Sequence, residues 1–388
     1  MRILFSICGY DVGGVATAFN VLARYLETLG HEVFVVLSNN RGMDDSLVDI
    51  SDRYVRDWIP YARCPIPFMG RPWLWINCLT RWGLYFKQVK RLLSSLDYDV
   101  FVMYHGQDVI WRWFANKPSV FWFHEIASDS TILGAKKWGI TPMFMRWSKY
   151  RAILGYNRFV AVSSNSAQSL KDYFDGRVNP ITIRNLIDVE RIKRLSLIPQ
   201  QEIVRGKGAN LVYVGRLSYE KGVDRLLEAF AKFHINHHDA KLWIVGGSHD
   251  MDYKAILDGI IKNLGLCEDV IFLGEKTNPY SYMRAADLLI LPSREEGLGL
   301  VLWESLLCNT SVLATRAGGT EDALDHGRIG MLVENSTEGL LDGLCRFFAQ
   351  QKQYDFNIAH EYIGQCLKKA KNDIKNLFEG LKELGTRK

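Results

Sequence analysis

The first half of the chain alternates short apolar runs with amphipathic stretches. It opens on RILFSI, passes a glycine pair and a helical pattern over 15–29, and reaches EVFVVLS after Gly30-His31. Apolar runs of this kind, separated by helical stretches, are typical of a parallel sheet with helices on both faces. Further strands of such a sheet are predicted at 99–105, 119–125 and 158–164.

The same pattern restarts after a polar stretch and predicts a second doubly wound domain. Its strands are expected at 210–215, 240–247, 269–274, 287–292 and 310–315. The last segment is amphipathic and is expected to form a terminal helix. The predicted organisation is a first Rossmann-like α/β domain over 1–190, a linker over 191–208, a second Rossmann-like domain over 209–356 and a C-terminal helix over 357–388.

Length and composition agree with two soluble domains. The 388 residues exceed the size at which single cores usually stop growing. Seven scattered cysteines without a C-x-x-C pair indicate neither a disulfide framework nor a zinc site, which fits a reducing cytosol. The opening apolar run is too short for a signal peptide, and no run reaches the ~18 apolar residues of a membrane span. A cytoplasmic protein is expected, with peripheral attachment to the cytoplasmic face of the inner membrane left open.

The strongest chemical signal is the segment GRLSYEKG, placed between a predicted strand and a predicted helix. Arg216 and Lys221 lie five residues apart in it, after Gly215. Two cations at a strand-end turn suit a diphosphate, and backbone N–H groups and the helix dipole add to the attraction. The alternative is a solvated turn with two surface cations.

A second signal follows in SREEGLGL and the apolar helix after it. Gly299 and Leu300 can bring backbone amides close to an anion at a helix start. Glu296 before this turn and Glu304 in the helix can accept hydrogen bonds from sugar hydroxyls at two points of one ligand. Glu304 lies among leucines and a tryptophan, where an unpaired charge is costly.

The first domain offers weaker signals. Gly13-Gly14 follow the first strand, but GYDVGGVA is not the G-x-G-x-x-G of nicotinamide cofactors. His124 ends a strand, where a satisfied polar residue is an equal alternative to a functional one. The triplet of His234, His237 and His238 resembles metal-ligand spacing, yet lies in a polar connection. No metal is inferred.

In this order the residues resemble the family-4 retaining glycosyltransferases of the GT-B fold, over nearly the whole chain. The resemblance implies two Rossmann-like domains that face a central cleft, a nucleotide diphosphate sugar as donor, and no cofactor. The pieces that carry it are Gly13-Gly14, Gly30-His31, His124-Glu125, Ser163, GRLSYEKG, IVGG at 244–247, ADLLILPS, Glu296-x7-Glu304 and Gly318-Gly319.

The resemblance also implies roles for single residues. Family members bind the donor pyrophosphate with the residues that match Arg216 and Lys221. They hold the sugar hydroxyls with the match to Glu296 and the ribose with the match to Glu304. The residue that matches His124 lies by the donor sugar, and the glycine pair lets a loop approach phosphate and acceptor. Three departures concern loop shape: Leu186, Asn309 and Thr320-Glu321.

The expected reaction is transfer of a hexose-type sugar to a hydroxyl of a glycan or lipid-linked saccharide, in cell-surface polysaccharide biosynthesis. Arg216, Lys221 and the amides at Gly299-Leu300 can hold the charge that grows on the β-phosphate without a metal ion. Same-face attack is favoured because no carboxylate nucleophile is evident. The alternatives are a sugar-nucleotide 2-epimerase and a non-catalytic nucleotide-sugar binding protein.

Charge and aromatic residues are concentrated in the first half. The segment 53–91 carries eight basic residues against one acid, 134–158 carries six against none, and nine of eleven tryptophans precede residue 150. An apolar stripe over 73–93 beside these cations predicts docking on an anionic membrane surface. The alternative is that the stripe packs on the domain's own sheet. Nucleic acid is not an expected partner, because no reading motif accompanies the charge.

Overall fold

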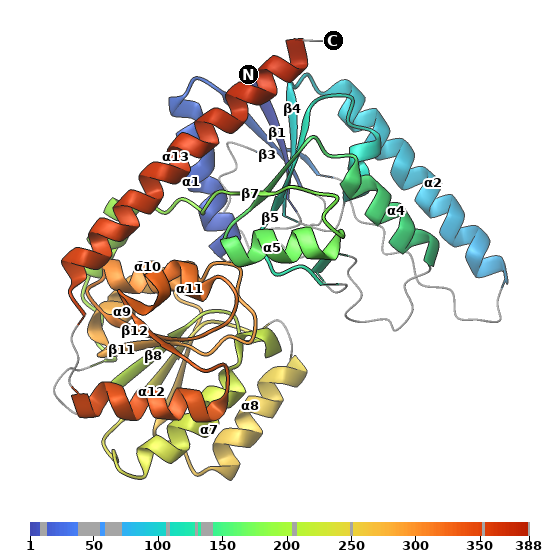
Figure 1. Cartoon of the computed structure of the whole chain (residues 1–388). Helices are drawn as coiled ribbons and strands as arrows, with labels where there is room; N and C mark the ends of the chain where they lie inside the picture. The colour runs from blue at the N-terminus through green and yellow to red at the C-terminus, as the bar shows by residue number, and fades with distance from the viewer. Residues whose placement is uncertain are drawn as a thin grey trace. The chain divides into compact units, whose positions relative to one another are not determined.

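The chain folds into two compact units in the computed structural model (Figure 1). The first unit holds 1–162, 167–183 and 371–388, and the second holds 163–166 and 184–370. The sequence placed the end of the first domain at 190. The structure describes residues 1–7, 14–37, 55–58, 72–105, 109–128, 131–132, 143–203, 208–248, 251–350 and 354–386.

The first unit is built on one sheet whose described strands run in the order β3-β2-β1-β4-β5-β6-β7. Neighbouring strands pair in parallel throughout, for example Phe5 of β1 with Val35 of β2 and with Val102 of β4. The strands are β1 (Arg2–Ile7), β2 (Glu32–Leu37), β3 (Val55–Trp58), β4 (Val100–His105), β5 (Ser119–Phe123), β6 (Arg158–Ala161) and β7 (Ile181–Thr182).

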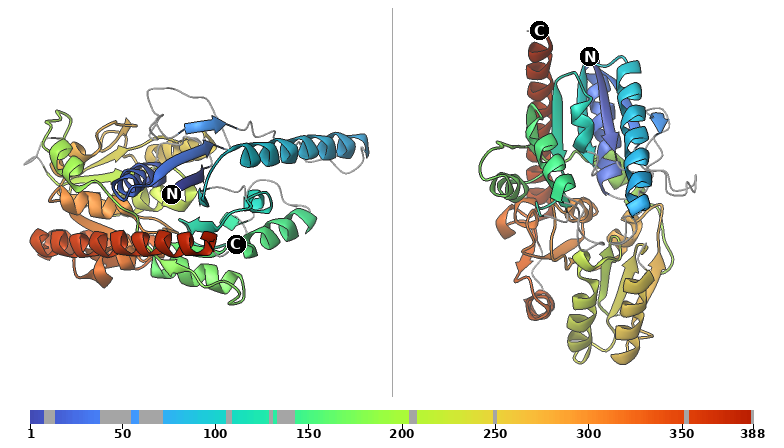
Figure 2. Two further views of the ribbon diagram at one scale, coloured as in Figure 1. Left: turned by 90° about the horizontal axis from the view of Figure 1, so that it is seen from above. Right: turned by 90° about the vertical axis from the view of Figure 1, so that its right-hand side faces the viewer.

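Helices cover this sheet on both faces (Figure 2). Phe19 of α1 packs edge-on against Phe5 of β1 and Tyr104 of β4, with ring centroids 5.1 and 5.5 Å apart. On the other face, Val89 and Leu93 of α2 join a core that also holds Trp111. The helices are α1 (Gly14–Thr28), α2 (Pro72–Ser95), the 3-10 helix η2 (Val109–Trp113), α4 (Met143–Leu154) and α5 (Ser164–Tyr173).

The second unit repeats the plan with the strand order β10-β9-β8-β11-β12-β13, again parallel. The strands are β8 (Asn210–Val214), β9 (Lys241–Val245), β10 (Val270–Gly274), β11 (Leu288–Leu291), β12 (Ser311–Thr315) and β13 (Met331–Val333). The helices are α6 (Val189–Ser196), α7 (Val223–His234), α8 (Met251–Asn263), α9 (Tyr280–Ala285), α10 (Leu300–Leu307), α11 (Thr320–Ala323) and α12 (Thr337–Gln350), with the 3-10 turns η4 (Tyr219–Lys221) and η5 (Asp325–Gly327).

The core of the second unit lies between its sheet and the helices α7, α8 and α12 (Figure 1). Leu226 of α7, Leu257 of α8 and Leu340 of α12 are fully buried there. Helices α6, α9 and α10 contact one another. The prediction of two doubly wound α/β domains is confirmed, and the three short strands β3, β7 and β13 were not predicted.

The predicted C-terminal helix is present as α13 (Phe356–Thr386). It begins in the second unit, where His360 bonds the carbonyl of Leu306 at 2.9 Å. Its last part belongs to the first unit, where the hydroxyl of Tyr25 donates to the carbonyl of Lys371 and Phe378 lies against His31. None of the helices that the structure describes is both long and apolar enough to cross a bilayer.

Candidate functional site

The direction of strand addition reverses between β8 and β11 in the second unit. These strands are neighbours, while β9 and β10 extend the sheet on one side and β12 and β13 on the other. Ligands of open α/β sheets bind beyond the carboxyl ends of the strands at such a switch point. Both motifs singled out in the sequence follow these two strands, so the fold brings them to one edge.

A buried tyrosine holds the backbone of the turn after β8. The hydroxyl of Tyr213 donates to the carbonyl of Arg216 at 2.6 Å. Burial, and after it the negative charge of Glu296, raises the pKa of this phenol well above its ordinary value, so it stays a donor. The guanidinium of Arg216 itself is half exposed and lies 4.0 Å from Glu220. Arg216 is therefore presented to solvent on an anchored backbone.

The structure pairs two of the predicted site residues directly. Nζ of Lys221 donates to Oε2 of Glu296 at 2.7 Å, and the side chains are 19% and 12% exposed. The hydroxyl of Ser293 donates to the same oxygen at 3.1 Å. An ammonium has three donors, so this bond leaves Lys221 able to contact a further anion.

The start of α10 supplies backbone donors beside this pair. Gly299 is the N-cap with φ +79°, and Leu300 is the first helical residue. A glycine cap offers the first N–H groups of the helix no side-chain acceptor, and such a helix start favours a nearby anion. The N–H of Gly319 donates to the carbonyl of Glu296 at 2.8 Å, which holds the preceding loop.

Glu304 lies on α10 and is half-buried, whereas its neighbours Leu302, Trp303 and Leu306 are buried. Burial, together with the negative charge of Glu304 one turn earlier, raises the pKa of Cys308 to about 12. The carboxylate thus lies on the half-exposed face of a helix that is otherwise embedded in the unit.

Two predicted residues belong to the first unit. Gly14 is the first residue of α1, and its partner Gly13 lies outside the described residues. His124 follows β5, is buried, and lies edge-on against Tyr104 with ring centroids 4.4 Å apart. Its role beside a donor sugar stays a prediction.

The histidine triplet has structural contacts. Nε2 of His234 lies 2.9 Å from Oδ2 of Asp269, and His237 stacks on Phe233 at 3.9 Å between ring centroids. Within the described ranges, no group of three or more histidine, cysteine or acidic side chains is placed to hold a metal ion.

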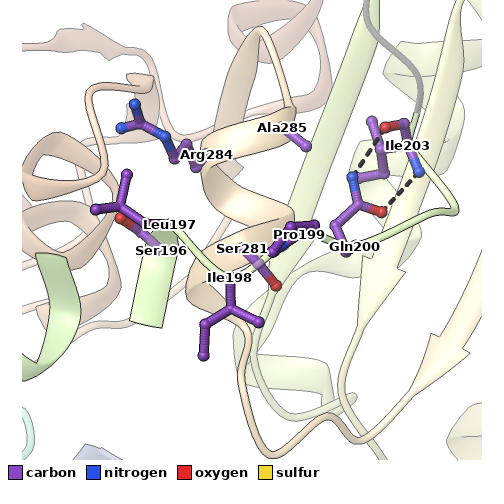
Figure 3. A pocket seen from close by; sticks show the side chains of 9 residues that line it. All are labelled: Ser196, Leu197, Ile198, Pro199, Gln200, Ile203, Ser281, Arg284 and Ala285. Carbon is purple, nitrogen blue, oxygen red and sulfur yellow. Dashed lines mark hydrogen bonds between the residues drawn. The ribbon is translucent and has the colours of Figure 1, made fainter. Parts of the chain in front are cut away.

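A hollow of about 330 Å³ in the second unit lies between the segment that follows α6 and the helix α9 (Figure 3). Gln200 closes one side of it by exchanging two 2.8 Å hydrogen bonds with the backbone of Ile203. Arg284 and Ala285 line it just before β11 begins. None of the predicted site residues lines this hollow.

Sequence reasoning missed the residues that tie the two motif loops together. Arg294 makes a two-point ion pair with Asp224, at 2.8 and 2.6 Å. Arg294 lies within SREEGLGL, and Asp224 lies two residues after GRLSYEKG, so two opposite charges at matched strand-end turns were the available signal.

The fold and this site define an α/β protein with two doubly wound units and a switch point in the second that carries Arg216, Lys221 and Glu296. The family model described as Glycosyltransferase Family 4 matches residues 12–191, and that described as Glycosyl transferases group 1 matches residues 197–358. The chain therefore belongs to the family-4 glycosyltransferases, as its motifs predicted.

Among curated relatives, N-acetyl-alpha-D-glucosaminyl L-malate synthase of Bacillus anthracis is 32% identical over 56% of this chain and 53% of its own length. A Campylobacter jejuni N-acetylgalactosaminyltransferase, named for a diphospho-undecaprenol-linked acceptor, is 29% identical over 61% of this chain and 63% of its own. The chain thus matches between about half and two thirds of these two relatives.

Solved structures share the fold. The Anabaena protein HepE, crystallised with UDP, superposes with a TM-score of 0.71 at 20% identity, over 98% of this chain and 100% of its own. The same protein was also solved with UDP and glucose. This likeness confirms a GT-B architecture with a C-terminal helix.

Proposed function

We propose that this chain is a retaining glycosyltransferase that moves a hexose-type sugar from a nucleotide diphosphate sugar to a hydroxyl of a glycan or lipid-linked saccharide. The observation that carries the proposal is the 2.7 Å pair of Lys221 and Glu296 at the switch point of the second sheet. Half-exposed Arg216 and the glycine-capped start of α10 lie on loops at the same edge.

The chemistry needed there is charge stabilisation. As the anomeric bond breaks, negative charge grows on the β-phosphate and the sugar becomes oxocarbenium-like. Lys221 and Arg216 provide cations and α10 provides N–H donors for that charge. Glu296 takes the sugar hydroxyls and Glu304 the ribose. The departing phosphate then accepts the proton of the acceptor hydroxyl as it attacks on the same face.

The relatives support a sugar-nucleotide donor, but their names describe different classes of acceptor. One is named for transfer to a small hydroxy acid and one for transfer to a lipid-linked saccharide. A 2-epimerase would use the same two-unit architecture with acid/base carboxylates in the first unit. A binding protein would keep the donor residues without an acceptor site.

A donor screen tests the proposal. The chain is mixed with UDP-, GDP-, ADP- and dTDP-linked hexoses, and binding is read as a thermal shift. Donors that bind are then incubated with glycan and lipid-linked acceptors, and the anomeric configuration of the product is read by NMR. We expect transfer with retention. Interconversion of the donor at C2 would identify an epimerase, and binding without turnover a sensor.

We further propose that the first unit docks on an anionic membrane surface and so reaches a lipid-linked acceptor. Exposed apolar side chains occur on three neighbouring elements: Leu84 on α2, Trp113 on η2 and Trp147 on α4. The indole of Trp111 on η2 donates to the hydroxyl of Tyr85 on α2 at 2.7 Å, which ties the first two together.

Cations accompany these side chains. Lys87, Lys90 and Arg91 of α2 are exposed, and the guanidinium of Arg151 lies 5.8 Å from the Trp147 ring. A basic residue near an anionic leaflet contributes about 1 kcal/mol, and tryptophan suits the headgroup region. Val89 and Leu93 of the apolar stripe are buried in the unit's own core, so they are not available for docking. Trp75 and Lys136 lie where no side chain is described.

Liposome cosedimentation tests the docking. We expect binding to vesicles with phosphatidylglycerol, little binding to phosphatidylcholine alone, and loss of binding when Lys87, Lys90 and Arg91 are changed together to glutamate. The matched control reverses three exposed lysines of the second unit, Lys262, Lys368 and Lys369. An equal loss of vesicle binding in both triple variants would show that net charge alone drives the binding, and it would refute the docking proposal.

A further inference from the structure

Arg294 lies two residues before Glu296 and reaches back to the turn that carries Lys221. Its guanidinium makes a two-point ion pair with Asp224, Nη1 to Oδ1 at 2.8 Å and Nη2 to Oδ2 at 2.6 Å. Nη1 also donates to the carbonyl of Tyr219 at 2.7 Å, and the guanidinium lies 3.9 Å from the centre of that ring. One side chain therefore joins both loops at four points.

The ion pair is held from a third element. The hydroxyl of Tyr253 on α8 donates to Oδ1 of Asp224 at 2.9 Å. Burial alone would raise the pKa of Asp224, but hydrogen bonds from Arg294 and Tyr253 outweigh it and hold this pKa below its ordinary value. Both side chains of the pair are about one-fifth exposed, so it is shielded from bulk water more than a surface pair.

The backbones of the two loops are also in close contact. The N–H of Arg294 donates to the carbonyl of Glu220 at 2.8 Å. A Cβ at Gly222, which has φ +68°, would lie 2.2 Å from the carbonyl oxygen of Pro292. Nη2 of Arg225 donates to that same carbonyl at 2.8 Å. These three contacts hold the backbones of the two loops together.

Lys221 lies in the loop after β8, and Glu296 lies in the loop after β11, so these contacts join the loops that carry the two residues. We propose that Arg294, Asp224 and Tyr219 form a brace that positions the Lys221 ammonium against the Glu296 carboxylate and so sets its place for the donor diphosphate. Arg294 and Asp224 are positioning residues that act through Lys221. The inference rests on the proposed function, because Lys221 is the diphosphate cation there.

Arg294→Lys tests the brace, since a lysine keeps the charge but cannot make the two-point pair or the stack. The dissociation constants of UDP, GDP, ADP and dTDP are measured by calorimetry, and the nucleotide that the wild-type chain binds most tightly is used throughout. We expect Arg294→Lys to weaken it about tenfold in the wild-type background, and less than about twofold in a Lys221→Ala background, because residues of one network are not additive.

The matched control is Arg346→Lys. Arg346 pairs with Asp342 on α12 at 2.8 Å, and both side chains are about half exposed or more, so this swap should leave nucleotide affinity unchanged. Asp224→Asn removes the charge of the other member of the ion pair. It tests the same brace and replaces Arg294→Lys if that variant does not fold. Melting curves of every variant are recorded beside the affinities.

Two results would overturn the brace while leaving the donor site intact. One is equal weakening by Arg294→Lys with and without Lys221, which is the signature of a merely structural residue. The other is an unchanged affinity in both Arg294→Lys and Asp224→Asn. If the wild-type chain binds none of the four nucleotides, the proposed function fails and the brace fails with it.

Discussion

The ammonium of Lys221 is fixed before any donor arrives. It is bonded to Glu296, which is itself bonded to Ser293, so neither side chain must be ordered on binding. Preorganised charges cost no reorganisation when charge develops in a transition state. The pair can thus serve the phosphate and the sugar of one ligand at once.

Removing either cation should slow transfer strongly. Arg216→Ala or Lys221→Ala is expected to remove about 2–4 kcal/mol of transition-state stabilisation, which is roughly a hundredfold or more in rate. Initial rates with a saturating acceptor measure this. The control is Lys232→Ala, an exposed lysine on α7 that pairs with Glu338. Wild-type rates in both site variants would refute the assignment.

Substitutions of the two glutamates should affect different steps, namely sugar transfer and nucleotide binding. Glu296→Gln is expected chiefly to lower kcat, because the proposed mechanism assigns Glu296 to the sugar whose charge changes, whereas Glu304→Gln is expected chiefly to weaken nucleotide binding. Steady-state kinetics and calorimetry with the free nucleotide separate the two effects. The same loss of nucleotide affinity in both variants would contradict the division of roles.

Sequence reasoning located these single residues because glycine-flanked cations and carboxylates have a local signature. It did not pair Asp224 with Arg294, since the two residues lie seventy positions apart in the chain and only the fold brings them together. The role of His234 likewise depends on a distant residue, because Asp269 lies beside it in the structure. The local sequence pattern predicts which residue types could bind a sugar nucleotide. Contacts between segments that are distant in the chain determine which of the charged side chains can face a ligand.

At the scale of elements, the start of α10 determines how backbone donors reach the site. Gly299→Ala should destabilise the second unit by about 1–2 kcal/mol, because φ +79° is unfavourable for an L-residue. The added Cβ would also lie 3.2 Å from Leu291 and Leu302. Thermal unfolding measures this loss, and nucleotide affinity should fall with it. An unchanged melting temperature would contradict this reading of the turn.

The long apolar strands were predicted because several of them, such as β5 and β12, are buried along their whole length and read as continuous runs. The short strands β3, β7 and β13 were not, since segments such as Ile181–Thr182 carry too few residues for any period to appear. The apolar stripe of α2 was ambiguous for another reason. Periodicity shows that a helix has an apolar face but not what covers it, and in part the core does so.

At the scale of the whole molecule, the proposed chemistry places all of the positive charge on the chain itself. Transfer is therefore expected to continue in excess EDTA. The measurement is the initial rate before and after chelation, with added magnesium and manganese as separate arms. Activity that disappears with EDTA and returns with either ion would refute metal independence.

The helix α13 has a consequence for how such enzymes can diversify. Residues 371–388 belong to the first unit, although the whole of 184–370 belongs to the second. Recombination at a single crossover would therefore combine one parent's donor unit with a tail selected to pack on that parent's own first unit. A chimera that takes only 184–370 from a relative and keeps the native tail should yield more folded protein than one that takes everything after 184. Donor specificity is thus expected to be inherited with the internal segment 184–370 rather than with everything after residue 184.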